Sequence, residues 1–255
     1  MTTKRYVVIS DLQMPLHDRR AWKAVLRFLA DYKPDEVVNI GDLNDYTSPG
    51  RWTKDTRAEY QESVFEEAAF ARKHYCVELR KVFDGPSVLL GSNHGERPMK
   101  YAEKYAPAIA DEEVFSEKAL LRLDDFGIEF IPDFYHFAPR WTMTHGHLGK
   151  IGLSQIAGNT ALNAAKKLGR NIVMGHTHRL GVGSHTTGVD GMSLTLTGME
   201  VGNLMDRRKA KYLAGYSGNW QQGFGLVDVN HEHVQVTPIR IGRGQFIVDG
   251  SVYRL

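Results

Sequence analysis

The sequence is short of cysteine, of long apolar runs and of net charge, and each shortage excludes a class of protein. Cys76 is the single cysteine, so no internal disulfide framework can form, which fits a reducing compartment. No apolar run is long enough to cross a bilayer, and the first one, residues 6–9, is too short for a secretion signal. We therefore expect a cytoplasmic protein without a membrane partner. The net charge of +2 is too small to indicate a nucleic-acid-binding protein, although it is compatible with an anionic substrate.

The composition is that of an ordinary globular protein. Hydrophobic residues make up 42% and charged residues 24% of the 255 residues, which is enough to build a core. Short β-branched runs predict strands at residues 6–9, 36–40, 87–90, 141–144 and 172–174. Helices are predicted after the capping residue Asp18, from the capping box Thr56-Arg-Ala-Glu59 to about Val82, from Pro98, and from about Ser154 to Leu168.

The pattern becomes rich in strands after Gly175. Residues 186–198, 223–230 and 233–241 predict antiparallel strands, and Asp249-Gly250 predicts a final hairpin. The chain contains no evident linker or internal repeat. We therefore expect one α/β domain over residues 1–255, with a β-rich C-terminal part at about 183–255, whose sheets pack face to face between helices.

Five polar clusters rich in glycine each follow one of the short predicted strands. They are Asp11-Leu-Gln13, Gly41-Asp42-Leu-Asn-Asp45, Gly91-Ser-Asn93-His94-Gly-Glu96, His145-Gly-His147 and Gly175-His176-Thr-His178. In α/β sheets, loops at the carboxyl ends of strands converge on one crevice, so residues far apart in sequence can meet there. Imidazole nitrogens and carboxyl or amide oxygens suit divalent ions such as Mn²⁺, Fe²⁺ or Zn²⁺, and the absence of thiolate ligands argues against a structural zinc site.

The ordered set of clusters resembles the calcineurin-like metallophosphoesterases, and the surrounding sequence resembles their phage-encoded branch. The resemblance spans residues 11 to 178, about two-thirds of the chain. It implies a four-layer α-β-β-α sandwich with a binuclear metal centre at the carboxyl ends of the strands. By the same resemblance, the first metal would be held by Asp11, Gln13, Asp42 and His178, and the second by Asp42, Asn93, His145 and His176. His94 would be the general acid, oriented by Asp45.

One departure from the family pattern concerns the first metal site. Gln13 stands where the family usually has histidine, and an amide carbonyl is a harder and weaker ligand than imidazole. We therefore expect two divalent ions with Mn²⁺ preferred, and Fe²⁺, Zn²⁺ or Mg²⁺ as alternatives. His17 either reaches the first metal or faces the substrate from its loop.

Three further features are candidates for substrate binding. His147 either points away from the metals or contacts a phosphate. The pair Arg51-Trp52 either stacks on a base, or Trp52 packs in the core or anchors the loop. The basic run at residues 207–211 either binds a nucleic-acid backbone or is a solvated face.

The sequence thus predicts a metal-dependent phosphodiesterase that uses a hydroxide bridging the two ions. A general acid such as His94 is most valuable for a diester, whose alkoxide leaves poorly. The expected partner is a phosphodiester, with a 2′,3′-cyclic nucleotide or small diester as first substrate and nucleic acid as an alternative; the oligomeric state is open. The competing interpretations are a nuclease of the Mre11 type, a monophosphatase, and a degenerate scaffold that only binds. Protons compete with metal for histidine, so activity should fall below about pH 6.

Overall fold

Alternate side chains of the first strand, β1 (Lys4–Ile9), face two different cores. Tyr6 and Val8 point into one hydrophobic cluster, whereas Val7 and Ile9 point into another. A strand buried on both faces is typical of the centre of a layered α/β protein, which explains why its sequence is continuously apolar. The structure is a computed structural model, and it describes residues 3–50, 53–210 and 218–255.

β1 lies inside a six-stranded sheet. Its strands, in spatial order, are β11 (His233–Arg240), β10 (Gly223–Asn230), β1, β2 (Glu36–Asn39), β3 (Ser87–Leu90) and β4 (Ile128–Ile131). β1 to β4 run parallel, and β10 pairs antiparallel with β1. The β-rich C-terminal part is therefore built into the N-terminal sheet.

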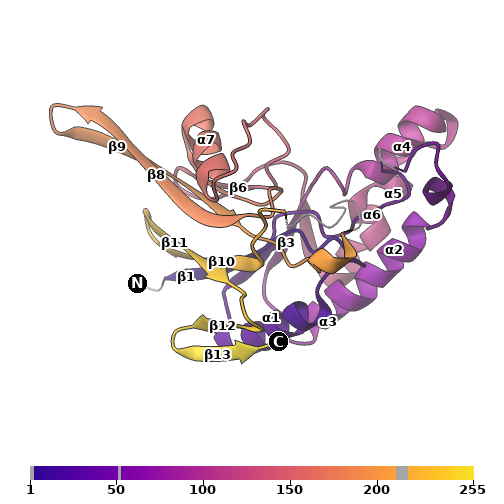
Figure 1. Cartoon of the computed structure of the whole chain (residues 1–255), viewed down its shortest axis with the longest axis horizontal. Helices are drawn as coiled ribbons and strands as arrows, with labels where there is room; N and C mark the ends of the chain where they lie inside the picture. Colours follow the sequence, from indigo (N-terminus) through magenta and orange to yellow (C-terminus); the bar gives the residue numbers. More distant parts are fainter. Residues whose placement is uncertain (1–2, 51–52, 211–217) are drawn as a thin grey trace.

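The second sheet has five strands. In spatial order they are β5 (Tyr135–Ala138), β6 (Trp141–Thr144), β7 (Asn171–Met174), β9 (Met192–Val201) and β8 (Leu180–Val189). The single strand predicted at residues 186–198 is wrong, because the chain turns at Asp190-Gly191 with φ of 51° and 78°. Two successive positive φ values are those of a type I′ hairpin turn, which an Asp-Gly pair favours. β8 and β9 extend from the body as a long hairpin (Figure 1).

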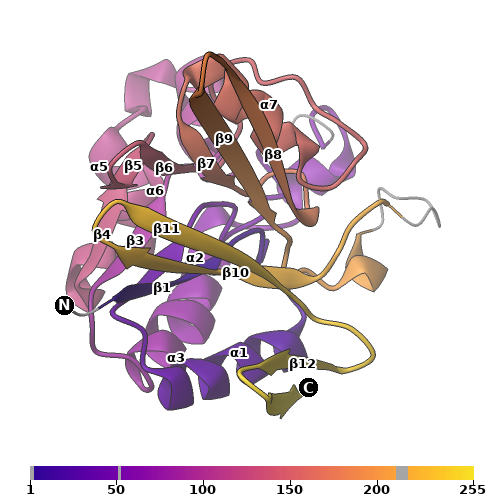
Figure 2. The same cartoon turned by 90° about the vertical axis from the view of Figure 1, so that its left-hand side faces the viewer.

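The two sheets pack face to face between helices. Tyr6, Val8 and Val38 of the first sheet share a buried cluster with Met143 and Val173 of the second. α1 (Arg19–Tyr32), α2 (Val64–Ala71) and α3 (Val77–Arg80) cover the other face of the first sheet, while α7 (Asn159–Leu168) covers the other face of the second. Figure 2 shows α7 on one side and α1 and α3 on the other. The predicted α/β class is confirmed.

α1 begins where its cap predicts. The Asp18 carboxylate accepts from the backbone N–H groups of Arg20 and Ala21, at 3.0 and 3.2 Å. Phe28 of α1 also packs edge-on against Phe246 of the terminal hairpin, β12 (Gln245–Val248) and β13 (Ser251–Arg254).

The long helix predicted from Thr56 begins after Ser63 instead. Thr56 caps only a short 3-10 helix, Arg57–Tyr60. The Glu59 side chain accepts hydrogen bonds from tertiary and local partners, namely Lys54 Nζ, the Asp55 N–H and Tyr101 Oη. Since Glu59 is engaged elsewhere, the capping box does not close. α2 then continues through a π-helical turn, Arg72–Cys76, into α3, and Cys76 is buried there.

The remaining helices lie between β3 and β4. They are α4 (Arg97–Tyr105), α5 (Glu112–Phe115) and α6 (Glu117–Leu121). Pro98 stands in the first turn of α4 as predicted. α7 begins at Asn159, later than the predicted Ser154, because Gly158 adopts a φ of 84° directly before it. Within the described ranges, no helix combines the length and apolarity needed to cross a membrane.

Candidate metal centre

Ligand-type side chains follow five parallel strands from both sheets. β1, β2 and β3 lead into the first three polar clusters, and β6 and β7 lead into the histidine clusters. Five of these side chains have a backbone in the left-handed region, which is uncommon for residues other than glycine. They are Asp11 (φ 53°), Gln13 (47°), Asp42 (51°), His176 (69°) and His178 (59°). Clustering of such conformations is typical of functional sites, where the surrounding fold has to impose them.

Two glycines allow these loops to approach closely. A Cβ on Gly41 would lie 2.7 Å from Ser92 Cβ and 2.9 Å from His145 Nδ1. A Cβ on Gly175 would lie 2.0 Å from Ser10 Oγ and 2.8 Å from Asp11 Oδ2. Both contacts are impossible, so only glycine lets the loops of the two sheets meet.

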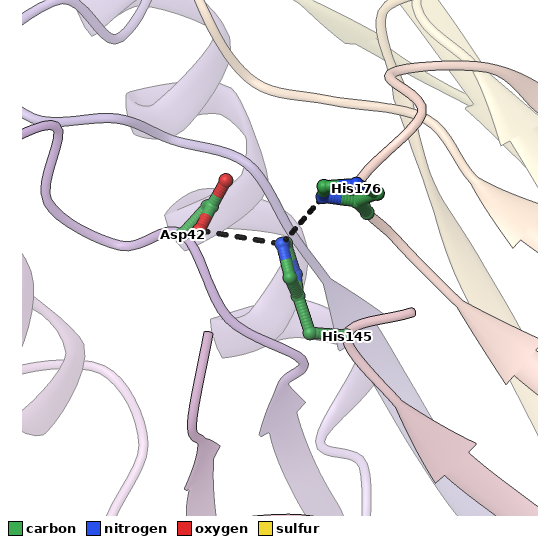
Figure 3. A group of neighbouring side chains, drawn as sticks. All are labelled: Asp42, His145 and His176. Carbon is green, nitrogen blue, oxygen red and sulfur yellow. Dashed lines mark hydrogen bonds and ion pairs between the residues drawn. The ribbon is translucent and has the colours of Figure 1, made fainter. Parts of the chain in front are cut away.

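One group of ligands surrounds His145 Nε2. This atom lies 3.3 Å from Asp42 Oδ1, 3.1 Å from Asn93 Oδ1 and 3.2 Å from His176 Nδ1. Figure 3 shows the Asp42, His145 and His176 side chains pointing toward one another, and one ligand atom from each lies within 4.8 Å of the others. His145 Nδ1 is 3.0 Å from the Ile40 carbonyl and can donate to it, which leaves Nε2 with a lone pair for a metal.

A second group lies beside it. His178 Nε2 is 3.2 Å from Asp11 Oδ1 and 3.2 Å from Gln13 Nε2. Gln13 Oε1 is buried and has no hydrogen-bond partner in the described part of the chain, and the buried Asp11 Oδ1 has only the contact with His178. Buried oxygens without partners are costly unless something satisfies them, and a cation would. Turning the Gln13 amide over would place its carbonyl oxygen beside His178.

The ionisable side chains around His145 Nε2 shift one another's pKa values. Burial opposes ionisation of Asp42, but the His145 and His94 imidazoles hold its pKa well below the ordinary value. Burial likewise opposes protonation of His145, but Asp42 raises its pKa to about 9. Burial and the neighbouring His145 lower the pKa of His176 to about 4. This mixture of two imidazoles, one carboxylate and one amide oxygen fits a borderline divalent cation.

His94 and Asp45 also meet at this site. His94 Nδ1 lies 3.1 Å from Asp45 Oδ1, and His94 Nε2 lies 3.7 Å from Asp42 Oδ2. Arg97 was not predicted as a site residue, yet its Nη2 lies 2.8 Å from His94 Nε2. Since arginine only donates, His94 Nε2 is the acceptor and Nδ1 carries the proton that faces Asp45.

Two buried glutamates support these loops. Glu67 accepts from the backbone N–H groups of Tyr46 and Thr47, and burial together with Asp45 raises the pKa of Glu67 to about 8. Glu117 is 3% exposed, and burial together with Asp42 raises its pKa to about 8. Neither Glu117 oxygen has a hydrogen-bond partner among the described residues.

Comparison with known proteins identifies close relatives. No protein-family model matches the chain. The chain is 44% identical over 254 residues to the Gene 54 protein of Mycobacterium phage D29, covering 99% of this chain and 100% of that protein. It is 43% identical over 254 residues to the Gene 54 protein of Mycobacterium phage L5, with the same coverage. The chain belongs to the Gene 54 protein family.

Solved structures resemble this Gene 54 family member only distantly. Wild-type Vps29 complexed with Zn²⁺ from Entamoeba histolytica is 15% identical with a TM-score of 0.42, covering 97% of this chain and 95% of that one. YfcE, a phosphoesterase from E. coli, is 17% identical with a TM-score of 0.43, covering 91% of this chain and 98% of that one. Such distant likeness carries no conclusion about activity, which has to come from the site itself.

The candidate ligands of this Gene 54 family member line a cavity of about 850 Å³. One face of α4 forms part of its wall through Arg97, Lys100, Tyr101, Lys104 and Tyr105. Their spacing of three and four residues places them on one side of the helix. The spacing of these basic and aromatic residues is the signal in the sequence from which this face could have been found. Trp220 lines the cavity as well, with its ring 4.3 Å from that of His178.

The predicted substrate residues have different outcomes. His147 lines the cavity, and its Nε2 lies 3.6 Å from Glu96 Oε1. His17 is 2% exposed and packs against Phe70 at 5.9 Å between ring centroids, and burial lowers its pKa to about 4. His17 does not line the cavity, and its contact with a metal or the substrate stays a prediction. Arg51 and Trp52 lie outside the described residues.

Proposed function

We propose that this protein is a divalent-metal-dependent phosphoesterase of the calcineurin-like metallophosphoesterase type that hydrolyses phosphate diesters. The observation that supports this most is the convergence of Asp42, His145 and His176 at a cavity that also holds Asp45 and His94. Asn93, Asp11, Gln13 and His178 complete a set able to hold two ions, with Asp42 the candidate for the shared ligand. Bound there, divalent cations would supply positive charge to offset the phosphoryl oxygens and would activate water at neutral pH.

His94 is the candidate proton donor to the leaving oxygen. Asp45 fixes the orientation of its ring through Nδ1, so Nε2 faces the cavity. In the present arrangement Nε2 accepts from Arg97, so Arg97 has to move before Nε2 can donate a proton. A substrate phosphate would attract the Arg97 guanidinium, which pairs well with phosphate oxygens. Substrate binding would thereby release His94 for its role.

The preference for diesters is argued from His94 as a proton donor that Asp45 positions. A departing alkoxide gains most from a positioned acid, whereas a good leaving group gains little. A 2′,3′-cyclic nucleotide or a small model diester is the first substrate to test.

The test is hydrolysis of the dinucleotide TpT, a diester whose leaving group is an alkoxide, and of thymidine 5′-phosphate, a monoester with the same kind of leaving group, by the purified protein with Mn²⁺. We expect Mn²⁺-dependent turnover that is faster for the diester and is lost in Asp42→Asn. Asp84→Asn, a change of the same kind at an exposed position, is the control and should retain full activity. Faster cleavage of the monoester would contradict the diester preference. No metal-dependent turnover of either ester would favour the scaffold alternative and overturn the proposal.

A further inference from the structure

A second, smaller cavity lies next to the metal centre and is lined by arginine. Its volume is about 390 Å³, and Trp220 lines both it and the larger cavity. Its five arginines are Arg20, Arg207, Arg208, Arg240 and Arg243. They come from α1, from the 3-10 helix Arg207–Lys209, from the end of β11 and from the turn before β12. Only folding brings these four segments together, so the cluster is invisible in the sequence.

Little negative charge offsets these arginines. The carboxylates of the lining are those of Asp18 and Asp206. Asp18 caps α1 and accepts from Gln222, and Asp206 pairs with Arg208 at 2.9 Å. Within the part of the chain that the structure describes, the other four arginines form no ion pair within 4.0 Å. The cavity therefore concentrates positive charge in a protein whose whole net charge is +2.

The chemistry of this lining matches phosphates. Guanidinium groups bind phosphate oxygens in pairs of hydrogen bonds and are less strongly hydrated than ammonium groups. Five arginines are more than one phosphate can engage, so the cavity suits a ligand with several. All five are exposed, and the four that are not paired with Asp206 have guanidinium groups open to such a ligand.

The larger cavity continues the same pattern on the other side of the metal ligands. α4 presents Arg97, Lys100 and Lys104 there, together with Tyr101 and Tyr105. Trp220 stands where the two cavities meet. Cationic grooves interleaved with aromatic rings are typical of single-strand binding, because the backbone follows the charges while unpaired bases stack on the rings.

We propose that the arginine-lined cavity binds the backbone phosphates of a single-stranded nucleic acid whose strand passes Trp220 into the metal centre. The inference rests on the proposed function for the linkage that is cleaved, but its binding test needs no catalysis. Of the two interpretations of the basic run at residues 207–211, it favours binding of a nucleic-acid backbone, through Arg207 and Arg208 as members of a folded cluster.

The test is fluorescence anisotropy of a labelled ten-nucleotide oligo(dT) with the full chain in EDTA, at several salt concentrations. We expect Arg207→Gln/Arg243→Gln to bind at least about tenfold more weakly. The slope of the logarithm of its binding constant against the logarithm of salt concentration should fall in magnitude by about 1.4, since each single-strand phosphate contact contributes about 0.7. Lys81→Gln/Lys166→Gln removes two exposed positive charges elsewhere, from the end of α3 and from α7, and should bind like the unchanged protein. Mn²⁺-dependent hydrolysis of bis(p-nitrophenyl) phosphate should be the same in all three proteins.

Several outcomes would overturn the inference. Equal oligonucleotide binding by the arginine variant would show that the cavity does not hold the strand. Equally tight binding of a duplex of the same length, or equal competition by polyglutamate, would show that single-stranded nucleic acid is not the ligand. If the unchanged protein does not hydrolyse the model diester at all, only the proposed function fails. Failure of the proposed function and failure of strand binding can therefore be told apart.

Discussion

His94 and Asp45 are joined through one ring nitrogen. His94 Nδ1 lies 3.1 Å from Asp45 Oδ1 and also 3.1 Å from the Asp45 carbonyl oxygen. Both partners are acceptors, so Nδ1 is the protonated atom and the ring orientation is fixed. The opposite nitrogen, Nε2, is therefore held toward the cavity, where a leaving group would depart.

The first prediction concerns the leaving group. Replacing His94 with glutamine should slow cleavage of the dinucleotide TpT by about 10² to 10⁴-fold, the usual contribution of a general acid. The same variant should cleave bis(p-nitrophenyl) phosphate almost normally, since p-nitrophenolate leaves without a proton. The measurement is kcat of the variant and of the unchanged protein on both substrates with Mn²⁺, from which the loss on each substrate is obtained. Equal losses on both substrates would show that His94 has another role.

Asp45→Asn provides the matched comparison for that experiment. An amide can still bond to the His94 ring but cannot stabilise its protonated form. We expect a smaller loss on TpT than in His94→Gln, with KM little changed. A large rise in KM alone would indicate that Asp45 contributes to binding and does not position His94.

A second prediction links metal affinity to pH. Without metal, Asp42 raises the pKa of His145 to about 9, so His145 is protonated at pH 7, whereas the pKa of His176 is lowered to about 4 and this ring is neutral. Binding of a cation must therefore displace one proton below pH 9. Mn²⁺ affinity, measured by calorimetric titration, should rise about tenfold from pH 7 to 8 and then less steeply towards pH 9. Constant affinity across that range would contradict ligation by His145.

A third prediction tests Gln13. Its Oε1 is buried without a hydrogen-bond partner in the described structure, beside Asp11 and His178. Because imidazole is a softer and stronger ligand than an amide, Gln13→His should raise Zn²⁺ affinity by about tenfold and Mn²⁺ affinity less. Competition titrations with both metals measure the difference. Unchanged affinity for every metal would show that position 13 is not a ligand.

A fourth prediction concerns stability and pH. Burial raises the pKa of Glu117 to about 8, above its value in the unfolded chain, so the folded state binds the extra proton. Its contribution is fully present below about pH 4.5 and is lost as pH rises through 8, by up to roughly 5 kcal/mol. Glu117→Gln cannot ionise, so its Tm should exceed that of the unchanged protein at pH 8 to 9.

The check on this prediction is thermal unfolding in EDTA at pH values from 5 to 9. Near pH 5 the two proteins should have similar Tm values, because the buried carboxyl is then neutral in the folded state. Glu129→Gln, at an exposed position on β4, should follow the unchanged protein at every pH. Parallel Tm profiles for all three proteins would contradict a neutral buried Glu117.

Much of the fold could be predicted because local signals agreed with tertiary demands. The β1 run and the Asp18 cap, for example, specify their elements without help from distant residues. The true start of the long helix, after Ser63, could not be predicted. The Thr56 capping box fails because Glu59 bonds to Lys54 and Tyr101, and Tyr101 is distant in sequence. The hairpin at Asp190-Gly191 carried a recognisable turn signal that the sequence interpretation overlooked.

Part of the candidate site could also be predicted from the sequence, and part could not. The convergence of its candidate ligands could be predicted because each follows a short strand, and strand ends meet at one edge of a sheet. The cavity walls could not, because a charge or a ring on a helix looks the same whether it faces solvent or a cavity. Arg97, Trp220 and the five-arginine cluster acquire meaning only when distant segments are placed side by side.

The pairing of β10 with β1 has a consequence for how the molecule is made. Val7 lies opposite Leu226, so the strand that leads into Asp11 gains this neighbour only when the chain has been synthesised as far as β10. Until then β1 presents an unpaired edge, which is open to wrong partners. Contacts this distant along the chain form slowly. A chain that ends before Gly223 should therefore hold the loop of Asp11 on an unfinished sheet, and the candidate metal centre would form completely only after β10 has paired with β1.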